Sequence, residues 1–219
     1  MALVLVVRHG HAAGNAEHRF IGQSDVPLDE KGHAQAQALC DRLAGHALSR
    51  IVSSDLRRAV DTVTPLAARL GLPIEVDPRL REINNGEWTG LLPEEIANRW
   101  PELWNDYITG ADVERPGGET WGLVRERVVA AVTDIATANA VAVALVCTHG
   151  GPALNLARWA LGIPPGGNVF RGPLGAVMNA AITTIDTDGP RLLSFNDAGH
   201  LQELPELRYG YEGVAKNDR

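Results

Sequence analysis

The sequence predicts an α/β protein, a three-layer α/β/α sandwich with a mainly parallel central sheet. Short apolar runs alternate with longer segments of helical periodicity, which is typical of strand–helix crossover units. Two of the apolar runs, at about residues 2–7 and 141–147, each lead into a histidine followed by glycine. Because ligands of open α/β sheets bind at the carboxyl ends of the strands, the sequence predicts a site where these two runs end.

The expected strands and helices alternate along the chain, and right-handed crossovers would place helices on both faces of the sheet. Asp29 is expected to cap the first helix, and Ser53 or Ser54 the second. In chain order the elements are a strand at about 2–7, helix 29–43, strand 51–53, helix 55–70, strand 74–76, helix 120–138, and strands 141–147, 176–185 and 191–195.

The segment at about 86–118 differs in composition from the rest of the chain. It holds three of the five tryptophans, in a chain that is only 5% aromatic. Pro93 is expected to start a short helix in it and Pro101 to end that helix. We interpret the segment as a small helical cap over the carboxyl edge of the sheet, within a single domain of residues 1–219 that ends in a loose tail at about 211–219.

Length and composition indicate a folded protein with one sizeable core. The chain has 219 residues, of which 45% are hydrophobic and 21% charged, and these values argue against intrinsic disorder. Its two cysteines, Cys40 and Cys147, fall in a helical pattern and in an apolar strand. Both are therefore expected to be small core residues rather than a disulfide pair.

Charge and hydropathy limit the classes of partner. The formal net charge of −7 argues against nucleic acid or an anionic membrane, although a local cluster of arginine and histidine can still bind an anionic substrate. No apolar stretch approaches the roughly 20 residues that span a membrane. The segment before the first motif is too short for a signal peptide. We expect a cytoplasmic protein with no nucleic-acid or membrane partner, and a homodimer is left open.

Two strand-end motifs supply the candidate chemistry. Arg8–Gly10 (Arg-His-Gly) places a cation and an imidazole at one strand end, and Thr148–Gly151 (Thr-His-Gly-Gly) places a second imidazole at another. One histidine after a strand means little, but two at the same sheet edge can bring their rings close together. Glycines at the start of the following helix also let backbone N–H groups approach an anion.

The chain resembles the histidine phosphatases, also called the phosphoglycerate mutase-like superfamily, over nearly its whole length, and within that family the phosphatase branch. The resemblance rests on motifs that occur together in one order. They are Arg8–Gly10 with Asn15, Gly22–Leu28, Ser53–Ala59, Leu80–Ile83, Pro116–Thr120, Thr148–Gly151 and Asn196–Leu201. The resemblance implies phosphoryl transfer through a phosphohistidine intermediate.

Phosphoryl transfer needs a nucleophile, charge neutralisation and a proton donor. His9 fits the nucleophile, because the neighbouring guanidinium opposes protonation of its ring and a backbone carbonyl can fix its tautomer. Arg8 and a second arginine fit a phosphate clamp. The residues alone do not choose between Arg57 and Arg58, and the resemblance favours Arg58. His149 is expected to be a further donor to the phosphoryl group.

Glu82 is the candidate general acid, because a carboxyl near a partly apolar cap can have a raised pKa and donate a proton to the leaving oxygen. From the residues alone, a salt bridge between Glu82 and Arg79 or Arg81 is the simpler interpretation. The resemblance favours the catalytic role.

Three more residues are expected to line the phosphate site. Asn15 could donate its amide hydrogen to the phosphate, although without the motif it would be taken for a loop cap. Gln23 is expected in the pocket wall, and Gly150 is expected to offer its backbone N–H.

The chain departs from the family pattern directly after the first motif, where His11 and Ala12 replace a Glu or Gln and a Ser or Thr. The lost hydroxyl removes one contact near His9, and His11 is expected at the rim of the pocket. The pair His9 and His11 could bind zinc in another fold. The adjacent Arg8 disfavours a cation, so no metal or other cofactor is expected.

We expect a phosphatase that hydrolyses a small-molecule phosphomonoester. One alternative is a 2,3-bisphosphoglycerate-dependent phosphoglycerate mutase, but the interval from Glu82 to His149 is short for the insertion that mutases carry. Another alternative is a catalytically weak protein that binds a phosphorylated ligand. The joint presence of a nucleophile, a clamp and an acid disfavours it.

Overall fold

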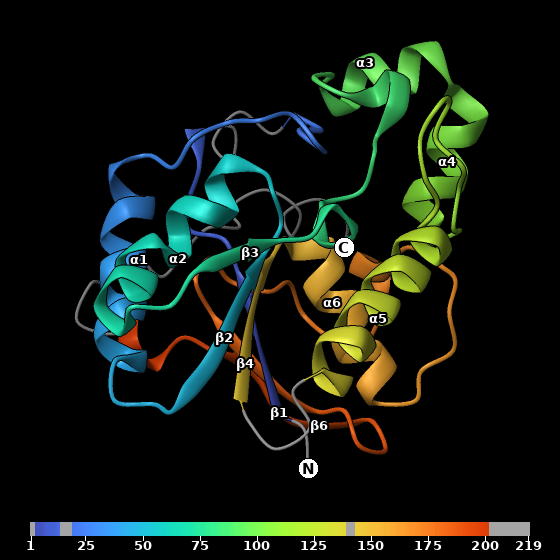
Figure 1. The fold of residues 1–219 in the computed structure, drawn as a ribbon. Coiled ribbons are helices and arrows are strands. Elements are labelled where there is room, and N and C mark those ends of the chain that lie inside the picture. The colour runs from blue at the N-terminus through green and yellow to red at the C-terminus, as the bar shows by residue number, and fades with distance from the viewer. Residues whose placement is uncertain (1–2, 14–18, 139–142, 202–219) are drawn as a thin grey trace.

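A computed structural model describes residues 3–13, 19–138 and 143–201 (Figure 1). Within these ranges the sheet has six strands in the order β3-β2-β4-β1-β5-β6. They are β1 (Leu3–Arg8), β2 (Leu48–Ser53), β3 (Ile74–Val76), β4 (Val143–Thr148), β5 (Ile182–Asp186) and β6 (Arg191–Asp197). Strands β3, β2, β4 and β1 are parallel, whereas β5 and β6 pair antiparallel at one edge. The predicted mainly parallel sheet is confirmed.

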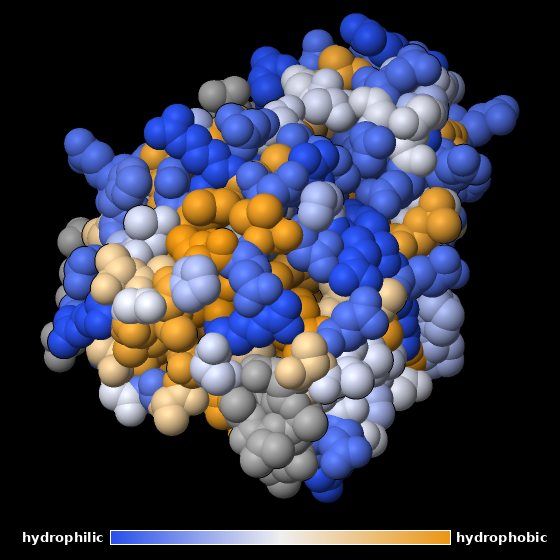
Figure 2. Space-filling view, in the orientation of Figure 1, coloured by the Kyte–Doolittle hydropathy of each residue, from blue (hydrophilic) through white to orange (hydrophobic). Residues whose placement is uncertain are grey.

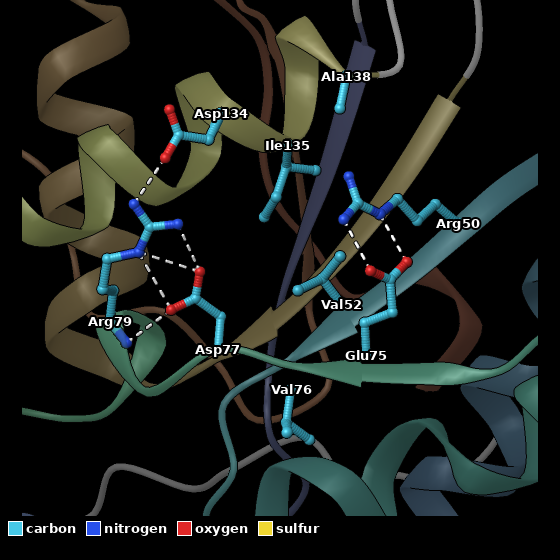
Figure 3. Close-up of a pocket in the computed structure, with 9 residues that line it drawn as sticks. All are labelled: Arg50, Val52, Glu75, Val76, Asp77, Arg79, Asp134, Ile135 and Ala138. Atoms are coloured by element: carbon cyan, nitrogen blue, oxygen red, sulfur yellow. Dashed lines mark hydrogen bonds and ion pairs between the residues drawn. The ribbon is translucent and has the colours of Figure 1, made fainter.

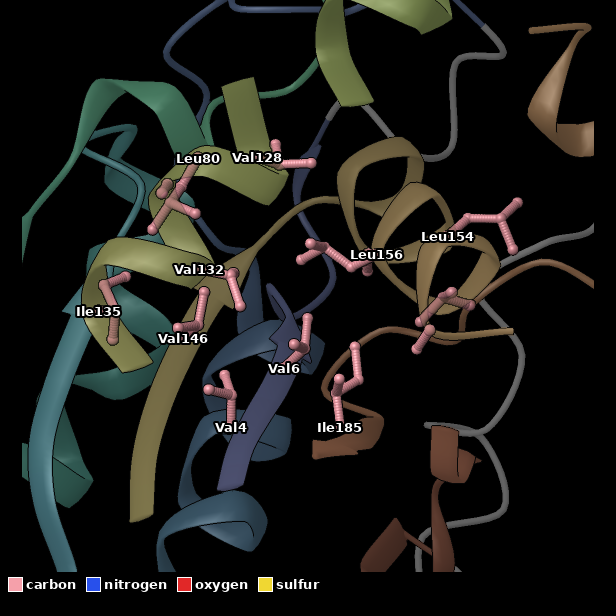
Figure 4. Close-up of a cluster of buried hydrophobic side chains, with 14 of the residues drawn as sticks. Val4, Val6, Leu80, Val128, Val132, Ile135, Val146, Leu154, Leu156 and Ile185 are labelled. Carbon is pink, nitrogen blue, oxygen red and sulfur yellow. The ribbon is translucent and has the colours of Figure 1, made fainter. Parts of the chain in front are cut away.

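Helices cover both faces of this sheet (Figure 1). The four large ones are α1 (Glu30–Leu43), α2 (Arg57–Leu70), α5 (Trp121–Thr137) and α6 (Gly150–Ala160). Alternate side chains of a strand point to opposite faces. Leu5 and Val7 belong to the core under α1 and α2, whereas Val4 and Val6 belong to the core under α5 and α6 (Figure 4). The three predicted layers are therefore present.

The starts of the first two helices differ in how they are capped. Asp29 caps α1 as predicted, because its carboxylate accepts the N–H of Gly32 at 2.9 Å. The prediction for the second helix is wrong. The α2 helix begins at Arg57 after Leu56, and no side chain of the N-cap residue bonds to it. The carboxylate of Asp25, from a distant loop, accepts the N–H of Arg57 at 2.7 Å instead.

The segment at 86–118 forms two helices beyond the end of the sheet, above α5 (Figure 1). They are α3 (Pro93–Arg99) and α4 (Pro101–Thr109). Pro101 follows the end of α3 as expected, but it also begins α4, because proline is well suited to a first helical position. Trp88 packs against Trp104 and Tyr107 of α4. The guanidinium of Arg115 lies 5.6 Å from the Trp88 ring centroid and 5.0 Å from that of Trp121 at the start of α5.

Cys40 and Cys147 are both free and buried, as predicted. The strand predicted at 176–185 starts only at Ile182, because the preceding residues form a loop around the end of β1. The tail predicted at about 211–219 lies outside the described residues. No helix in the described ranges is long and apolar enough to cross a membrane.

Candidate active site

The two strand-end histidines lie side by side because β1 and β4 are parallel neighbours. Arg8 is in register with Thr148, and the backbone N–H of His9 donates to the Thr148 carbonyl at 2.8 Å. The centroids of the His9 and His149 rings are 5.0 Å apart. Both side chains are buried, with His149 fully so. The register of the sheet thus places both imidazoles at one point of its carboxyl edge.

The hydrogen bonds of His9 fix its tautomer. Its Nδ1 lies 2.6 Å from the carbonyl oxygen of Gly10, and a carbonyl can only accept, so Nδ1 carries the proton. Its Nε2 keeps a lone pair, which accepts from Nε of Arg58 at 3.3 Å. Burial, Arg58 and Arg8 hold the pKa of His9 well below its usual value. The ring is therefore neutral at neutral pH, and its unprotonated Nε2 is chemically able to act as a nucleophile.

Arg58, in the first turn of α2, connects the two imidazoles. Its Nε also donates to Nδ1 of His149 at 3.2 Å. Its terminal nitrogens donate to the carbonyls of Ser24 at 2.7 Å and Gly22 at 2.9 Å. Burial lowers its pKa to about 10, so it stays charged at neutral pH. Arg57 points the other way, is 64% exposed and pairs with Asp61. The structure therefore places Arg58, and not Arg57, between the histidines.

Arg8 is held by a loop that precedes β5. Its Nη1 donates to the carbonyl of Val177 at 2.5 Å, and only 5% of the residue is exposed. The side-chain amide of Asn179 donates to the His9 carbonyl at 2.9 Å, and the N–H of Ala180 donates to the Arg8 carbonyl at 2.9 Å. Sequence reasoning did not find Asn179, because the segment resembles the start of an apolar strand.

Asn196 holds that loop in turn. Its side chain accepts the N–H of Met178 at 2.7 Å and donates to the Ala176 carbonyl at 3.2 Å. Asn196 and Ala180 both have φ near +57° (58° and 56°), a region that costs energy for residues other than glycine. Asn196 belongs to the last motif of the sequence, and its role was not anticipated from that motif.

The carboxylate of Glu82 lies against the backbone at the N-terminus of α6. One carboxylate oxygen accepts the N–H of Gly151 at 3.2 Å, and the other accepts the N–H of Ile83 at 2.9 Å. A side chain at Gly151 would come within 2.3 Å of the Trp121 ring and 2.7 Å of the Glu82 carboxylate, so glycine is required there. The Glu82 carboxylate and the Trp121 indole thus both lie close to Gly151 at the N-terminus of α6.

The salt-bridge alternative for Glu82 is not what the structure contains. Arg81 pairs bidentately with Asp55, and Arg79 pairs with Asp77 and Asp134. Both arginines are therefore paired with carboxylates other than Glu82, and the Glu82 carboxylate bonds to the N-terminus of α6.

The structure gives positions for three of the four other residues that the sequence singled out. Gln23 donates to the backbone carbonyl of Glu82 at 3.0 Å, so it holds the backbone that carries this carboxyl. Gly150 opens α6 next to Arg8. His11 turns toward α1, where its Nδ1 lies 2.5 Å from Asp29. Asn15 lies outside the described residues.

A cavity of about 280 Å³ lies elsewhere, between β3 and α5 (Figure 3). Its charged residues are already paired, Arg50 with Glu75 and Arg79 with Asp77 and Asp134. The surface on this side is partly apolar (Figure 2), and Val76 is 58% exposed. None of its lining residues belongs to the histidine site. In the described part of the chain, no group of three or more His, Cys, Asp or Glu could hold a metal ion.

Comparison with known proteins gives one family. The family model for the histidine phosphatase superfamily (branch 1) matches residues 4–198. Two proteins of Arabidopsis thaliana are each 32% identical to the chain. Phosphoglycerate mutase-like protein 4 aligns over 219 residues, 97% of this chain and 92% of its own, and a metal-independent phosphoserine phosphatase over 220 residues, 97% and 89%. The solved structure of a mycobacterial glucosyl-3-phosphoglycerate phosphatase is 30% identical, with a TM-score of 0.78 over 90% of this chain and 99% of that one.

The lowered pKa of His9 predicts where activity is lost in acid. A depressed pKa keeps the ring unprotonated as the pH falls, so the acid limb of kcat/KM should lie below pH 6.5. Arg58→Gln should lower the rate and should also move that limb to higher pH, because the substitution removes a cation that lowers the pKa of His9. Arg57→Gln is the matched control and should leave the limb in place. An unmoved limb in Arg58→Gln would contradict the assignment, since the ionisation of the substrate is common to all three enzymes.

Proposed function

The chain belongs to branch 1 of the histidine phosphatase superfamily, and we propose that it hydrolyses small-molecule phosphomonoesters through a phosphohistidine on His9. The observation that carries the proposal is the position of Arg58 Nε, 3.3 Å from His9 Nε2 and 3.2 Å from His149 Nδ1. The lone pairs of both rings face one buried cation. A phosphoryl group that enters there meets a nucleophile, a clamp and a second imidazole together.

The first step transfers the phosphoryl group to the protein. The Nε2 lone pair of His9 attacks phosphorus while the bond from phosphorus to the ester oxygen breaks. Arg8 and Arg58 neutralise the phosphoryl oxygens, because a guanidinium can donate to two of them at once. Glu82 gives its proton to the departing alkoxide, which leaves as the alcohol.

The second step releases phosphate. The Glu82 carboxylate accepts a proton from a water molecule as the water oxygen attacks the phosphohistidine. The bond between phosphorus and His9 Nε2 breaks, and the ring recovers its lone pair. Its Nδ1 keeps its hydrogen bond to Gly10 throughout, so the tautomer needed for the next turnover is already set.

The proposal includes metal independence and a cytoplasmic location. Two arginines supply the positive charge that a metal supplies in other phosphatases, and one relative is named a metal-independent phosphatase. Two free, buried cysteines are consistent with a reducing compartment.

Mutase activity is the second candidate, because one relative is named phosphoglycerate mutase-like. A mutase returns the phosphoryl group from histidine to a substrate, whereas a phosphatase gives it to water. Phosphate release should be screened on phosphoserine, phosphoglycerates, sugar phosphates and nucleotides, with isomerisation of 3-phosphoglycerate measured in parallel. Isomerisation that is faster than phosphate release would favour the mutase.

His9→Ala should abolish hydrolysis of p-nitrophenyl phosphate, because it removes the group that attacks the ester in the first step, and it should leave the circular dichroism spectrum of the folded protein unchanged. Wild-type protein quenched during turnover with labelled substrate should carry acid-labile, base-stable phosphate. Peptide mapping should place the label on His9. Label on another residue would overturn the assignment of the nucleophile.

Glu82→Gln should slow substrates with poor leaving groups far more than those with good ones. An alkyl alcohol leaves as a strongly basic alkoxide and needs the proton, whereas p-nitrophenolate barely does. The measurement is kcat/KM for a sugar phosphate and for p-nitrophenyl phosphate, with a melting curve. The exposed Glu87 offers a control in Glu87→Gln. Equal losses on both substrates would remove Glu82 from the acid role.

Activity should survive exhaustive treatment with EDTA. Arg8, Arg58 and His149 are assigned to stabilise the negative charge on the transferring phosphoryl group. Removal of divalent ions should therefore leave kcat unchanged. Phosphate release is compared before treatment, after it, and after Mg²⁺ or Zn²⁺ is added back. Turnover that disappears and returns with one of these ions would show that the proposal of metal independence is wrong.

A further inference from the structure

Ser54, at the end of β2, contacts the second histidine of the site. Its backbone N–H donates to the Cys147 carbonyl of β4 at 2.9 Å, which ties it to the strand that leads to His149. Its hydroxyl oxygen lies 2.9 Å from His149 Nε2 and accepts the N–H of Leu56 at 3.3 Å. Ser54 and His149 are both fully buried. The hydroxyl that sequence analysis considered for a helix cap therefore faces an imidazole.

The direction of the Ser54–His149 hydrogen bond follows from the other side of the ring. Arg58 Nε can only donate, so His149 Nδ1 must accept from it and carries no proton in this structure. The proton of the neutral ring is then on Nε2. Nε2–H donates to the Ser54 hydroxyl. Among the described residues, this hydroxyl is the one acceptor that is hydrogen-bonded to Nε2.

We propose that Ser54 is a positioning residue of the phosphoryl-transfer site. Its hydroxyl holds the His149 ring so that Nε2–H points to Ser54 and Nδ1 points to the phosphoryl group. The inference rests on the proposed function for its kinetic consequence, but the geometry of the ring stands independently. Ser54 does not touch the reacting atoms and acts only through His149.

A hydroxyl suits this position better than a carboxylate would. Nε2–H donates to Ser54 whether Nδ1 is unprotonated, as it is beside Arg58, or protonated by the proton of a phosphomonoester monoanion, after which Nδ1 donates to a phosphoryl oxygen. The ring need not turn between these states. A neutral partner also adds no negative charge close to a site that binds an anion, whereas a buried carboxylate would oppose the substrate.

The kinetic test compares Ser54→Ala with Ser54→Thr and Ser53→Ala. Loss of the acceptor leaves a buried N–H without a partner, so kcat for p-nitrophenyl phosphate should fall roughly tenfold to a hundredfold in Ser54→Ala, with a smaller change in KM. Ser54→Thr keeps the hydroxyl and should recover much of kcat. Ser53 is equally buried, but its hydroxyl donates to the Ser54 carbonyl, so Ser53→Ala is the matched control and should stay near wild type.

The structural test reads the ring by ¹⁵N NMR of histidine-labelled protein without substrate. His149 should show a protonated Nε2 and an unprotonated Nδ1. Its Nε2 proton should shift upfield in Ser54→Ala and not in Ser53→Ala. A protonated Nδ1 in wild type, or a kcat in Ser54→Ala equal to that of Ser53→Ala, would overturn the inference. If the wild type hydrolyses no phosphomonoester, the proposed function fails, and the NMR result still decides the place of Ser54.

Discussion

A buried guanidinium between two imidazole rings is the constraint on which the rest of the site depends. A cation removed from water is costly unless acceptors surround it. Arg58 is 3% exposed, and its partners are two backbone carbonyls and the lone pairs of His9 and His149. Both rings must then be neutral and turned toward the same point. Burial and the arginines favour that state, since they lower both pKa values. The same arrangement keeps Nε2 of His9 unprotonated and places it beside a cation that is able to bind an anion.

The antiparallel edge of the sheet contributes to this site as much as the parallel part does. The loop that enters β5 donates to the backbone of Arg8 and His9, and Asn196 at the end of β6 holds that loop. Two residues in this region, Ala180 and Asn196, have positive φ, a conformation that persists only where the surrounding contacts fix it. The backbone of His9 is thus positioned by residues about 170 and more positions later in the chain.

The sequence was informative where the signal is local. A strand that leads directly into Arg-His-Gly or Thr-His-Gly-Gly predicts which edge of the sheet holds the site. The alternation of strands and helices predicts the three layers. Other features depend on partners far along the chain. Arg57 and Arg58 are equivalent in the sequence, and only the carbonyls of Gly22 and Ser24 and the two imidazoles distinguish Arg58. The capping of α2 depends on Asp25 in the same way. The loop before β5 has the apolar composition of a strand, but the N–H of Ala180 and the side-chain amide of Asn179 bond to the carbonyls of Arg8 and His9.

A crystal structure with orthovanadate tests the central claim most directly. Vanadate forms a five-coordinate adduct that resembles the phosphoryl group in transfer. The account predicts vanadium bonded to Nε2 of His9, with its oxygens taking the place of the imidazoles as acceptors for Arg58 and one oxygen within hydrogen-bond distance of His149 Nδ1. Vanadium bonded to another residue would contradict the account. So would an adduct in which Arg58 still donates to both rings.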